Sequence, residues 1–278
     1  MRVILFGGDR RTLLLSRLFL NDGHKTDIWG GDKMGVPSVE LREAESAELL
    51  VLPYPCLDGD FIKAPFADVP LRVSELFEMK PSALVFAGAP GEVFFDLAKK
   101  NGISARDYVT ERLLDDNAYL TAEGALGLAI ENMPCRVRGS EILILGCGRI
   151  GRYLAELFGA LGARVTVSAL REESLRWIGG KGFSPVRTDR LAGDLGKFAL
   201  IANTVPRQIF KEAEIFETDK ECILLELASH PGGFELTAAE KIGRRIIGGG
   251  GLPGKTSPKT AAEIVYREIK DILETEEI

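Results

Sequence analysis

The feature that most constrains the fold is a glycine-rich turn with an apolar segment on either side. Residues 141–145 (Glu-Ile-Leu-Ile-Leu) are typical of a buried strand. The turn that follows consists of Gly146, Cys147, Gly148, Arg149, Ile150 and Gly151. Apolar residues then recur at helical spacing until Gly162, and residues 164–168 (Arg-Val-Thr-Val-Ser) indicate a second strand. A strand, a turn, a helix and a second strand in this order predict a βαβ unit.

The glycine spacing is typical of a turn that binds the phosphates of a dinucleotide. Gly146 permits the tight turn, Gly148 lets the backbone approach a pyrophosphate, and Gly151 lets the helix pack close to the strand. The N-terminus of the helix offers N–H groups to the same phosphates. We therefore expect all six residues of the turn to bind a dinucleotide in a Rossmann-type domain. The alternative is a turn that is only tight.

The end of the second strand indicates which dinucleotide is bound. An acidic residue at this position usually binds the ribose hydroxyls of NAD. This chain instead has Ser168-Ala-Leu-Arg171, and a hydroxyl followed by a guanidinium suits a 2′-phosphate. We predict NADP as the cofactor, with Ser168 and Arg171 as its ligands. The alternative is that Arg171 is a solvated residue of the next helix.

Two later apolar segments, 199–202 and 223–226, also end in polar turns. Because open α/β sheets bind ligands at the carboxyl ends of their strands, we expect both turns to line the nicotinamide half of the site. Structural turns of this composition are the alternative. The residues assigned to the cofactor here are Asn203, Thr204, Val205, Pro206, Leu227 and Ala228.

The first half of the chain repeats the pattern of strand, turn and helix. Its turn, Gly7-Gly8-Asp9-Arg10, lacks the third glycine and places a carboxylate where phosphates would lie. We expect this half to bind the substrate, with Arg10 and Arg11 as candidate ligands of a carboxylate. Solvated arginines in the first helical turn are the alternative.

The organisation of the chain indicates two Rossmann-like, three-layer α/β domains with a cleft between them, and 278 residues suit two domains. The expected parts are a substrate-side domain (1–118), a connecting helix (119–138), an NADP-binding domain (139–252), and a C-terminal segment with a helix that returns to the first domain (253–278). The proline-rich stretch 53–70 and the glycine-rich stretch 248–257 are expected to be loops.

Composition excludes several classes of protein. Hydrophobic residues make up 45% and charged residues 27% of the chain, which is typical of globular proteins. The net charge of −6 argues against a general nucleic-acid binder. No apolar stretch is long enough for a membrane helix and no signal peptide is evident, so we expect a cytoplasmic protein. The four cysteines lack the spacing of a metal site, and we expect none.

The segment before the last helix carries cations in an unfavourable place. Pro258 suits the first position of that helix, with Ser257 as its N-cap. A lysine there opposes the helix macrodipole unless an anion also binds. We therefore assign Lys255, Lys259 and Thr260 to an anionic substrate.

Several motifs, taken together, resemble the A subunit of dipicolinate synthase. They are Gly7–Arg10, Leu120–Ala125, Gly146–Gly151, Asn203–Pro206, Leu227–Gly233, Gly251–Gly254 and Pro258–Ala261. These motifs span nearly the whole chain. The Rossmann part alone is also similar to adenosylhomocysteinase, alanine dehydrogenase and the hydroxyacid dehydrogenases.

The resemblance implies oxidation of dihydrodipicolinate to dipicolinate with NADP, in spore-forming bacteria, together with a flavoprotein-like B subunit. The substrate is then a small dicarboxylate, to which we also assign Thr121. Aromatisation of the ring supplies driving force, so water or Glu123 could accept the proton, with His230 as a second candidate. A homo-oligomer is left open.

Two other functions are consistent with the sequence. The first is a 2-hydroxyacid or amino-acid dehydrogenase, in which His230 would be the base. The second is a nonenzymatic subunit that senses a nucleotide through the closure of its two domains. Turnover of the cofactor would distinguish the sensor from either enzyme.

Overall fold

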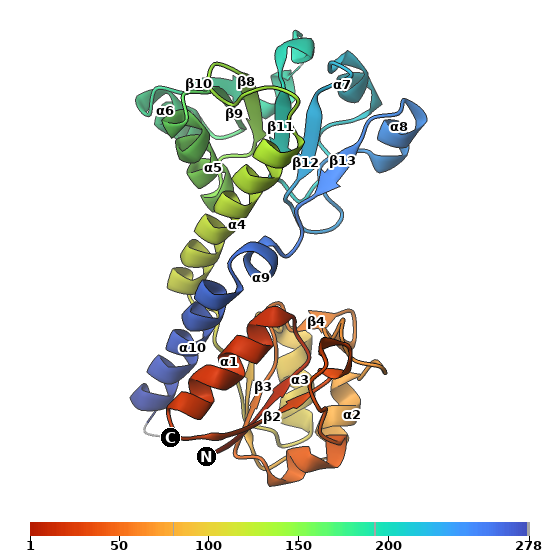
Figure 1. Ribbon diagram of the computed structural model, residues 1–278, viewed down its shortest axis with the longest axis vertical. Helices are drawn as coiled ribbons and strands as arrows, with labels where there is room; N and C mark the ends of the chain where they lie inside the picture. The colour runs from red at the N-terminus through yellow and green to blue at the C-terminus, as the bar shows by residue number, and fades with distance from the viewer. Residues whose placement is uncertain (80, 192, 277–278) are drawn as a thin grey trace. The chain divides into compact units, whose positions relative to one another are not determined.

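The computed structural model of the chain describes residues 1–79, 81–191 and 193–276. Its contacts divide the chain into two units (Figure 1). Unit 1 comprises Met1–Leu114 and Ser257–Ile278, and unit 2 comprises Asp115–Thr256. Each unit is α/β with a parallel sheet, which confirms the predicted fold class. The division falls near residues 114 and 256, where the sequence indicated 118 and 252.

Unit 1 contains a five-stranded parallel sheet in the order β2-β1-β3-β6-β7. Its strands are β1 (Arg2–Phe6), β2 (Lys25–Trp29), β3 (Leu49–Val51), β6 (Leu84–Ala87) and β7 (Ala105–Asp107). Its helices are α1 (Arg10–Asn21), η1 (Asp32–Met34), η2 (Leu41–Ser46), α2 (Val73–Glu78), α3 (Glu92–Lys100) and α10 (Pro258–Thr275). The proline-rich stretch expected to be a loop also holds an antiparallel pair, β4 (Leu57–Asp58) and β5 (Phe61–Ile62). Strands of two residues are too short to leave an alternating pattern in the sequence.

The last helix belongs to unit 1, although it is far from the rest of that unit in sequence. Its apolar stripe, which includes Ala261, Val265 and Ile269, is buried, and α10 packs against α1. The rings of Phe19 and Tyr266 meet edge to face, with their centroids 4.9 Å apart. The sequence thus predicted this helix, its start at Pro258 and its amphipathic face correctly.

Unit 2 contains a six-stranded parallel sheet in the order β10-β9-β8-β11-β12-β13. Its strands are β8 (Glu141–Leu145), β9 (Arg164–Ala169), β10 (Ser184–Arg187), β11 (Leu200–Asn203), β12 (Ile223–Glu226) and β13 (Ile246–Gly248). Its helices are α5 (Arg149–Ala160), α6 (Glu172–Gly180), η3 (Thr188–Arg190), η4 (Leu195–Lys197), α7 (Glu212–Glu217), α8 (Leu236–Lys241) and α9 (Leu252–Thr256). The long helix α4 (Glu111–Asn132) begins in unit 1 and continues in unit 2.

The glycine-rich stretch 248–257 was wrongly predicted to be a loop throughout. It contains the end of β13 and the helix α9, which the sequence analysis missed. Leu252, Pro253 and Gly254 are buried, and a side chain at Gly124 of α4 would lie 3.0 Å from the Cβ of Leu252. Packing against a glycine of another helix stabilises α9, and local sequence does not reveal such a contact.

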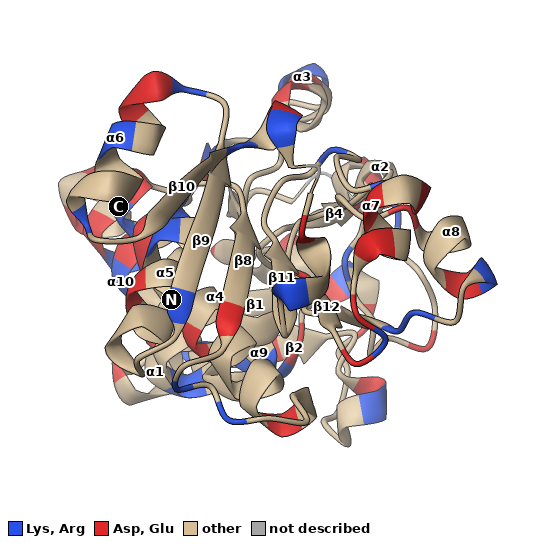
Figure 2. Ribbon diagram, turned by 90° about the horizontal axis from the view of Figure 1, so that it is seen from above, with Lys and Arg blue, Asp and Glu red and all other residues tan. Residues whose placement is uncertain are grey.

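The core of unit 2 lies on both faces of its sheet. Along β8, Ile142 and Ile144 face a cluster that includes residues of α5, whereas Leu143 and Leu145 face a second cluster on the other side. Parallel strands covered on both faces are continuous apolar runs, which is why this strand is evident in the sequence. The strands β8, β9 and β11 are uncharged along most of their length in Figure 2.

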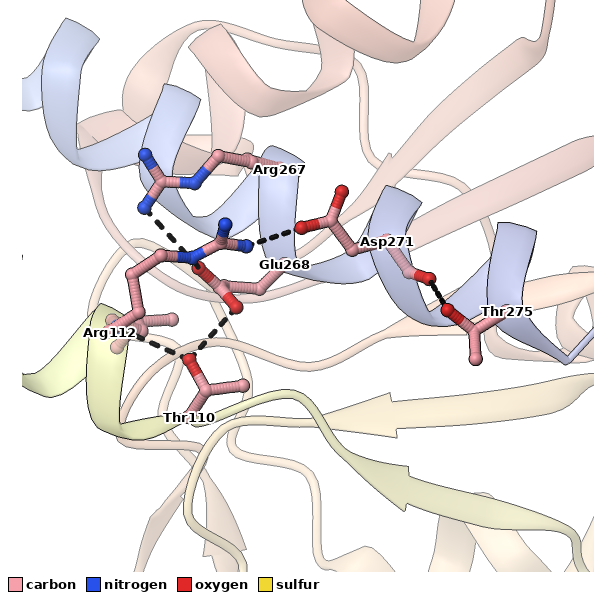
Figure 3. Close-up of polar contacts among 7 residues, drawn as sticks. Thr110, Arg112, Arg267, Glu268, Asp271 and Thr275 are labelled. Atoms are coloured by element: carbon pink, nitrogen blue, oxygen red, sulfur yellow. Dashed lines mark hydrogen bonds and ion pairs between the residues drawn. The ribbon is translucent and has the colours of Figure 1, made fainter.

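One buried charge ties α10 to the start of α4 within unit 1 (Figure 3). The side chain of Glu268 is 3% exposed, and its carboxylate accepts hydrogen bonds from Nε of Arg112 at 2.7 Å and Oγ1 of Thr110 at 2.8 Å. Arg267 also contacts this carboxylate, and Arg112 binds Asp271 as well. Burial acts to raise the pKa of Glu268, but the bonds from Arg112 and Thr110 outweigh it, so the pKa lies below its ordinary value.

We predict that Glu268→Gln lowers the free energy of unfolding at neutral pH by about 1.5–3 kcal/mol, because a buried carboxylate that accepts bonds from Arg112 and Thr110 is replaced by a neutral amide. A carboxyl with a lowered pKa in the folded protein stabilises it above its unfolded-state pKa, and this stabilisation is lost as the pH falls through the folded-state pKa. The difference between variant and parent in urea unfolding should therefore shrink below about pH 4.

The control is Asp271→Asn, because Asp271 binds the same guanidinium from a side chain that is 51% exposed. Loss of an exposed ion pair should cost at most about 1 kcal/mol. Equal losses for the two variants would contradict the importance of burial at Glu268.

Candidate functional site

The strand order of unit 2 identifies one place along its sheet where a ligand is expected to bind. From β8 the chain proceeds outward through β9 and β10, and then returns to the other side of β8 to form β11, β12 and β13. The order therefore reverses between β8 and β11, and open α/β sheets bind ligands at the carboxyl ends of strands at such a point. The glycine turn, Gly146–Gly151, begins directly at the carboxyl end of β8.

The three glycines of this turn have different surroundings. Gly146 has a φ of +102°, which side chains rarely allow, and a Cβ at Gly151 would lie 2.1 Å from the carbonyl oxygen of Gly146. A Cβ at Gly148 would meet no atom of the described residues within 4 Å. The fold thus accounts for Gly146 and Gly151, whereas Gly148 leaves open space next to the turn.

Helix α5 begins at this open space. Its N-cap is Gly148, which makes no side-chain cap in the described structure, and the N–H groups of a first helical turn have no acceptor within the helix. These groups can bind a phosphate, and the helix dipole favours its charge. Arg149 is exposed at the start of α5, and Cys147 and Ile150 are half-buried beside it.

Ser168 was expected to bind a 2′-phosphate, and the structure gives it another role. The residue is completely buried, and its hydroxyl accepts hydrogen bonds from the N–H of Gly146 at 3.3 Å and from Oγ1 of Thr188 at 3.1 Å. Ser168 therefore holds the glycine turn against the end of β9. Its hydroxyl has no surface with which to contact a ligand in this conformation.

Arg171 lies where the sequence placed it, exposed at the N-cap of α6 directly after β9. The structure adds Arg187, which pairs with Ala169 at the end of the neighbouring strand β10. The guanidinium of Arg187 binds Asp189 at 2.9 Å and Glu172 at 3.2 Å. The sequence alone does not reveal this second arginine, because its proximity to Arg171 depends on the strand order.

Asn203 was also expected to contact the cofactor, but its side chain is completely buried. Its Nδ2 donates to the carbonyl oxygen of Val205 at 2.9 Å and to Oε1 of Glu226 at 2.6 Å, and its Oδ1 accepts from the N–H of Val205. The amide therefore shapes the turn after β11 and connects it to β12. Thr204 and Val205 are half-buried, and Pro206 is exposed.

The turn after β12 runs from Leu227 to Gly233. Leu227 is buried and its N–H donates to the carbonyl oxygen of Asn203, whereas Ala228 is half-buried. His230 is exposed, so its ring is accessible to a ligand. The turns after β11 and β12 thus begin side by side, because Asn203 pairs with Glu226 at the ends of the two strands.

The residues assigned to the substrate are divided between the two units. Arg10, Lys259 and Thr260 lie in unit 1 and are exposed. Glu123 and Lys255 lie in unit 2 and are exposed, whereas Thr121 is buried there and its hydroxyl donates to the carbonyl oxygen of Asn117.

Arg11 does not have the environment expected of it. It forms two bonds to the carboxylate of Asp9, at 2.9 and 3.0 Å, and donates to the carbonyl oxygen of Tyr54. The side chain is only 17% exposed, so it is neither solvated nor open to a second carboxylate through these donors. The same pair neutralises the charge of Asp9. The signal for this pair in the sequence is that Asp9 and Arg11 lie two residues apart.

Arg10, unlike Arg11, lies at a hollow of unit 1. It lines a hollow of about 460 Å³ together with Arg17 and Lys33. The rest of the wall is formed by Leu13, Leu14, Met34, Phe66 and Pro258. Cations around an apolar surface suit an organic anion.

Lys259 has a weak partner of its own. Its side chain is 81% exposed, and its Nζ lies 3.9 Å from a carboxylate oxygen of Glu263, one helical turn further along α10. At this distance the pair is an ion pair without a hydrogen bond. The assignment of Lys255, Lys259 and Thr260 to an anion stays a prediction.

A hollow of about 1000 Å³ in unit 2 lies at the opposite end of the sheet from the glycine turn. Its walls include Glu141, Arg164 and Ser184, the first residues of β8, β9 and β10. Ligands of open parallel sheets bind at the carboxyl ends, so this hollow is not the candidate site despite its size.

Two features are absent from the part of the chain that the structure describes. No three His, Cys, Asp or Glu side chains in it lie close enough to hold a metal ion. None of its helices combines the length and apolar character needed to cross a membrane.

Comparison with known proteins shows what the chain is similar to. Residues 2–109 match the family described as the N-terminal domain of the dipicolinate synthase A subunit. The whole chain is 27% identical to the A subunit of dipicolinate synthase from Bacillus subtilis (strain 168), over 98% of this chain and 96% of that protein. The crystal structure of the A subunit of dipicolinate synthase from Bacillus halodurans superposes with a TM-score of 0.82 at 26% identity, covering 98% and 97% of the two chains.

The chain is similar to the A subunit of dipicolinate synthase along nearly its whole length. This confirms the resemblance that the sequence motifs indicated. The transhydrogenase of Sinorhizobium meliloti (TM-score 0.69, 14% identity, 98% and 94% coverage) and the D-lactate dehydrogenase of Escherichia coli (0.67, 12%, 100% and 97%) share the fold. The fold of this chain is therefore also that of dehydrogenases.

The different surroundings of the glycines lead to a prediction about the stability of unit 2. Gly151→Ala should destabilise unit 2 by about 1–3 kcal/mol, because the new methyl meets a backbone carbonyl that cannot turn away. Gly148→Val should unfold at nearly the temperature of the parent, because its Cβ enters open space. Thermal unfolding monitored by circular dichroism measures both, and similar losses for the two variants would contradict this assignment of roles.

Proposed function

We propose that this chain is an NAD(P)-dependent oxidoreductase that oxidises dihydrodipicolinate to dipicolinate, with NADP as the hydride acceptor, for spore formation. The observation that supports it most directly is the open position at Gly148, in a chain related to the A subunit of dipicolinate synthase over 98% of its length. The glycine turn would bind the pyrophosphate, and the nicotinamide supplies the hydride acceptor.

The residues of unit 2 fit a dinucleotide in three ways. Gly148 leaves room for the backbone to approach a pyrophosphate, and the first turn of α5 offers N–H donors. The exposed Arg171 follows β9, where a 2′-phosphate would lie. The turns after β11 and β12 begin at the same sheet edge and would border the nicotinamide.

The substrate of this reaction is a dicarboxylate, and each carboxylate needs a cation or several donors when it leaves water. Arg10 and the hollow that it lines are the best-supported candidates in unit 1. Lys255, Lys259 and Thr260 are the other candidates, whereas Arg11 and Thr121 already have partners within the chain.

The reaction also releases a proton. Glu123 and His230 are both exposed and therefore able to exchange protons with solvent. Because aromatisation of the ring drives the oxidation, a weak acceptor such as water or Glu123 is sufficient. His230 is a second candidate, and it would be the base if the substrate were a 2-hydroxyacid. A flavoprotein-like B subunit is proposed as partner because the B. subtilis relative is named as one subunit of a synthase.

The decisive experiment mixes dihydrodipicolinate, NADP and this chain, with and without the B subunit, and follows dipicolinate and NADPH spectroscopically. The parent should form both products in equal amounts, and Gly148→Val should bind NADP at least tenfold more weakly because its side chain occupies the space of the pyrophosphate. Binding of NADP without turnover of any substrate would instead favour the nucleotide sensor. Undiminished binding by the variant would show that the glycine turn is only structural.

We predict a preference for NADP that depends on Arg171. Arg171→Ala should weaken the binding of NADP by tenfold or more, because only NADP carries the 2′-phosphate. The affinity for NAD should change by less than about twofold. Titrations with both reduced cofactors measure the two affinities. The control is Arg176→Ala, which removes an exposed arginine from the same helix. Tighter binding of NAD by the parent would overturn the assignment.

A further inference from the structure

We infer that Glu226 is a positioning residue, whose carboxylate holds the loop of residues 227–233 in the shape that borders the dinucleotide. The inference rests on the proposed function for what the loop borders. The clasp itself, meaning Glu226 with the groups that it binds, is seen within unit 2 alone. From the sequence alone, Glu226 is only the last residue of a strand.

The carboxylate of Glu226 accepts four hydrogen bonds. Its Oε1 accepts from Nδ2 of Asn203 at 2.6 Å and from the N–H of Ala228 at 3.0 Å. Its Oε2 accepts from the N–H groups of Gly233 at 2.8 Å and Phe234 at 3.3 Å. One side chain therefore binds the backbone at both ends of the loop, and also the neighbouring strand.

The glycines of the loop fit around this clasp. A Cβ at Gly232 would lie 2.8 Å from Oε2 of Glu226, and one at Gly233 would lie 2.3 Å from Nδ2 of Asn203. The two glycines thus allow the backbone to approach the carboxylate and the amide closely. A side chain at either position would therefore displace the carboxylate of Glu226 or the amide of Asn203.

The clasp extends to the glycine turn. Thr204, next to Asn203, donates its hydroxyl to the carbonyl oxygen of Leu145 at 2.9 Å, and it packs directly beside Gly146. The turns that follow β8, β11 and β12 are therefore connected in series. A change at Glu226 should alter the loop and, through Asn203, the turn next to the pyrophosphate position.

This geometry also decides what Glu226 does not do. A general base must have a lone pair directed at the proton that it accepts. Both oxygens of Glu226 are directed at N–H donors of the protein, so a proton on this group would face four donors. Glu226 therefore acts as a fixed acceptor, and the proton of the reaction goes elsewhere.

The test compares Glu226→Gln with Glu235→Gln. Glu235 is the N-cap of helix α8 nearby, and its carboxylate accepts one hydrogen bond from the N–H of Glu212, so the control removes the same charge from the same region. In Glu226→Gln, the new side-chain amide would direct its own N–H groups at donors of the loop or of Asn203. A buried donor that loses its acceptor is costly.

Hydrogen exchange followed by mass spectrometry gives the first readout. In the protein without cofactor, peptides that contain Ala228, Gly233 and Phe234 should exchange at least tenfold faster in Glu226→Gln than in the parent. In Glu235→Gln they should exchange at the rate of the parent. Glu226→Asp keeps the charge on a shorter side chain and should exchange at an intermediate rate. An exchange rate in Glu226→Gln equal to that of the parent would show that Glu226 does not hold the loop.

Binding and turnover give the second readout. Glu226→Gln should raise the dissociation constant of NADPH about tenfold, whereas Glu235→Gln should change it less than twofold. The pH profile of kcat should keep its shape in Glu226→Gln, because a positioning residue does not exchange the proton of the reaction. Loss of the acidic limb, with kcat lowered a hundredfold or more, would show that Glu226 is a base.

The two proposals can fail separately. If the parent does not bind NADPH, the proposed function is wrong, while the exchange experiment still tests the clasp. If the parent binds NADPH but Glu226→Gln exchanges and binds as the parent does, the clasp is wrong and the proposed function is unaffected.

Discussion

The site depends on one close approach, between the first turn of α5 and the carbonyl group of Gly146. Because a Cβ at Gly151 would lie 2.1 Å from that oxygen, the helix can begin directly at the end of β8 only where this residue has no side chain. The close start directs the N–H groups of α5 at the space beside Gly148. A displaced helix would leave the same glycines in the sequence but no phosphate position.

From this point, polar side chains connect each strand end to the next. Ser168 holds Gly146 from β9, Thr204 binds Leu145 from β11, and Asn203 binds Glu226 on β12. Each of these bonds lies at least partly within the protein, where an unpaired partner would be costly. The edge that would bind the cofactor is therefore shaped by residues that have little surface to offer a ligand.

This division explains which parts of the site the sequence could predict. The glycine turn and the apolar strand before it are local patterns, and the structure contains both where the sequence placed them. Ser168 and Asn203 were assigned to the ligand because they follow strands, a position that does not tell whether a side chain turns outward or inward. The partners of Arg187 and Glu226 are brought near by strand order, and Glu268 meets Arg112 from the other end of the chain, so no local pattern could reveal them.

The charges of the chain follow the same division. Glu268 is buried against cations, and Glu226 has its acceptors used by backbone N–H groups and an amide, so both carboxylates shape the protein. Arg10, Arg171 and Lys259 are exposed, and they remain available to anions from solution. Water and salt screen the attraction between exposed cations and an anionic ligand, so these cations add little binding energy while they stay in solvent. They add more if binding removes them from water. Strong preference for a phosphorylated cofactor therefore requires that Arg171 loses water when the cofactor binds, and a rigid edge held by buried groups is what makes such a fit reproducible.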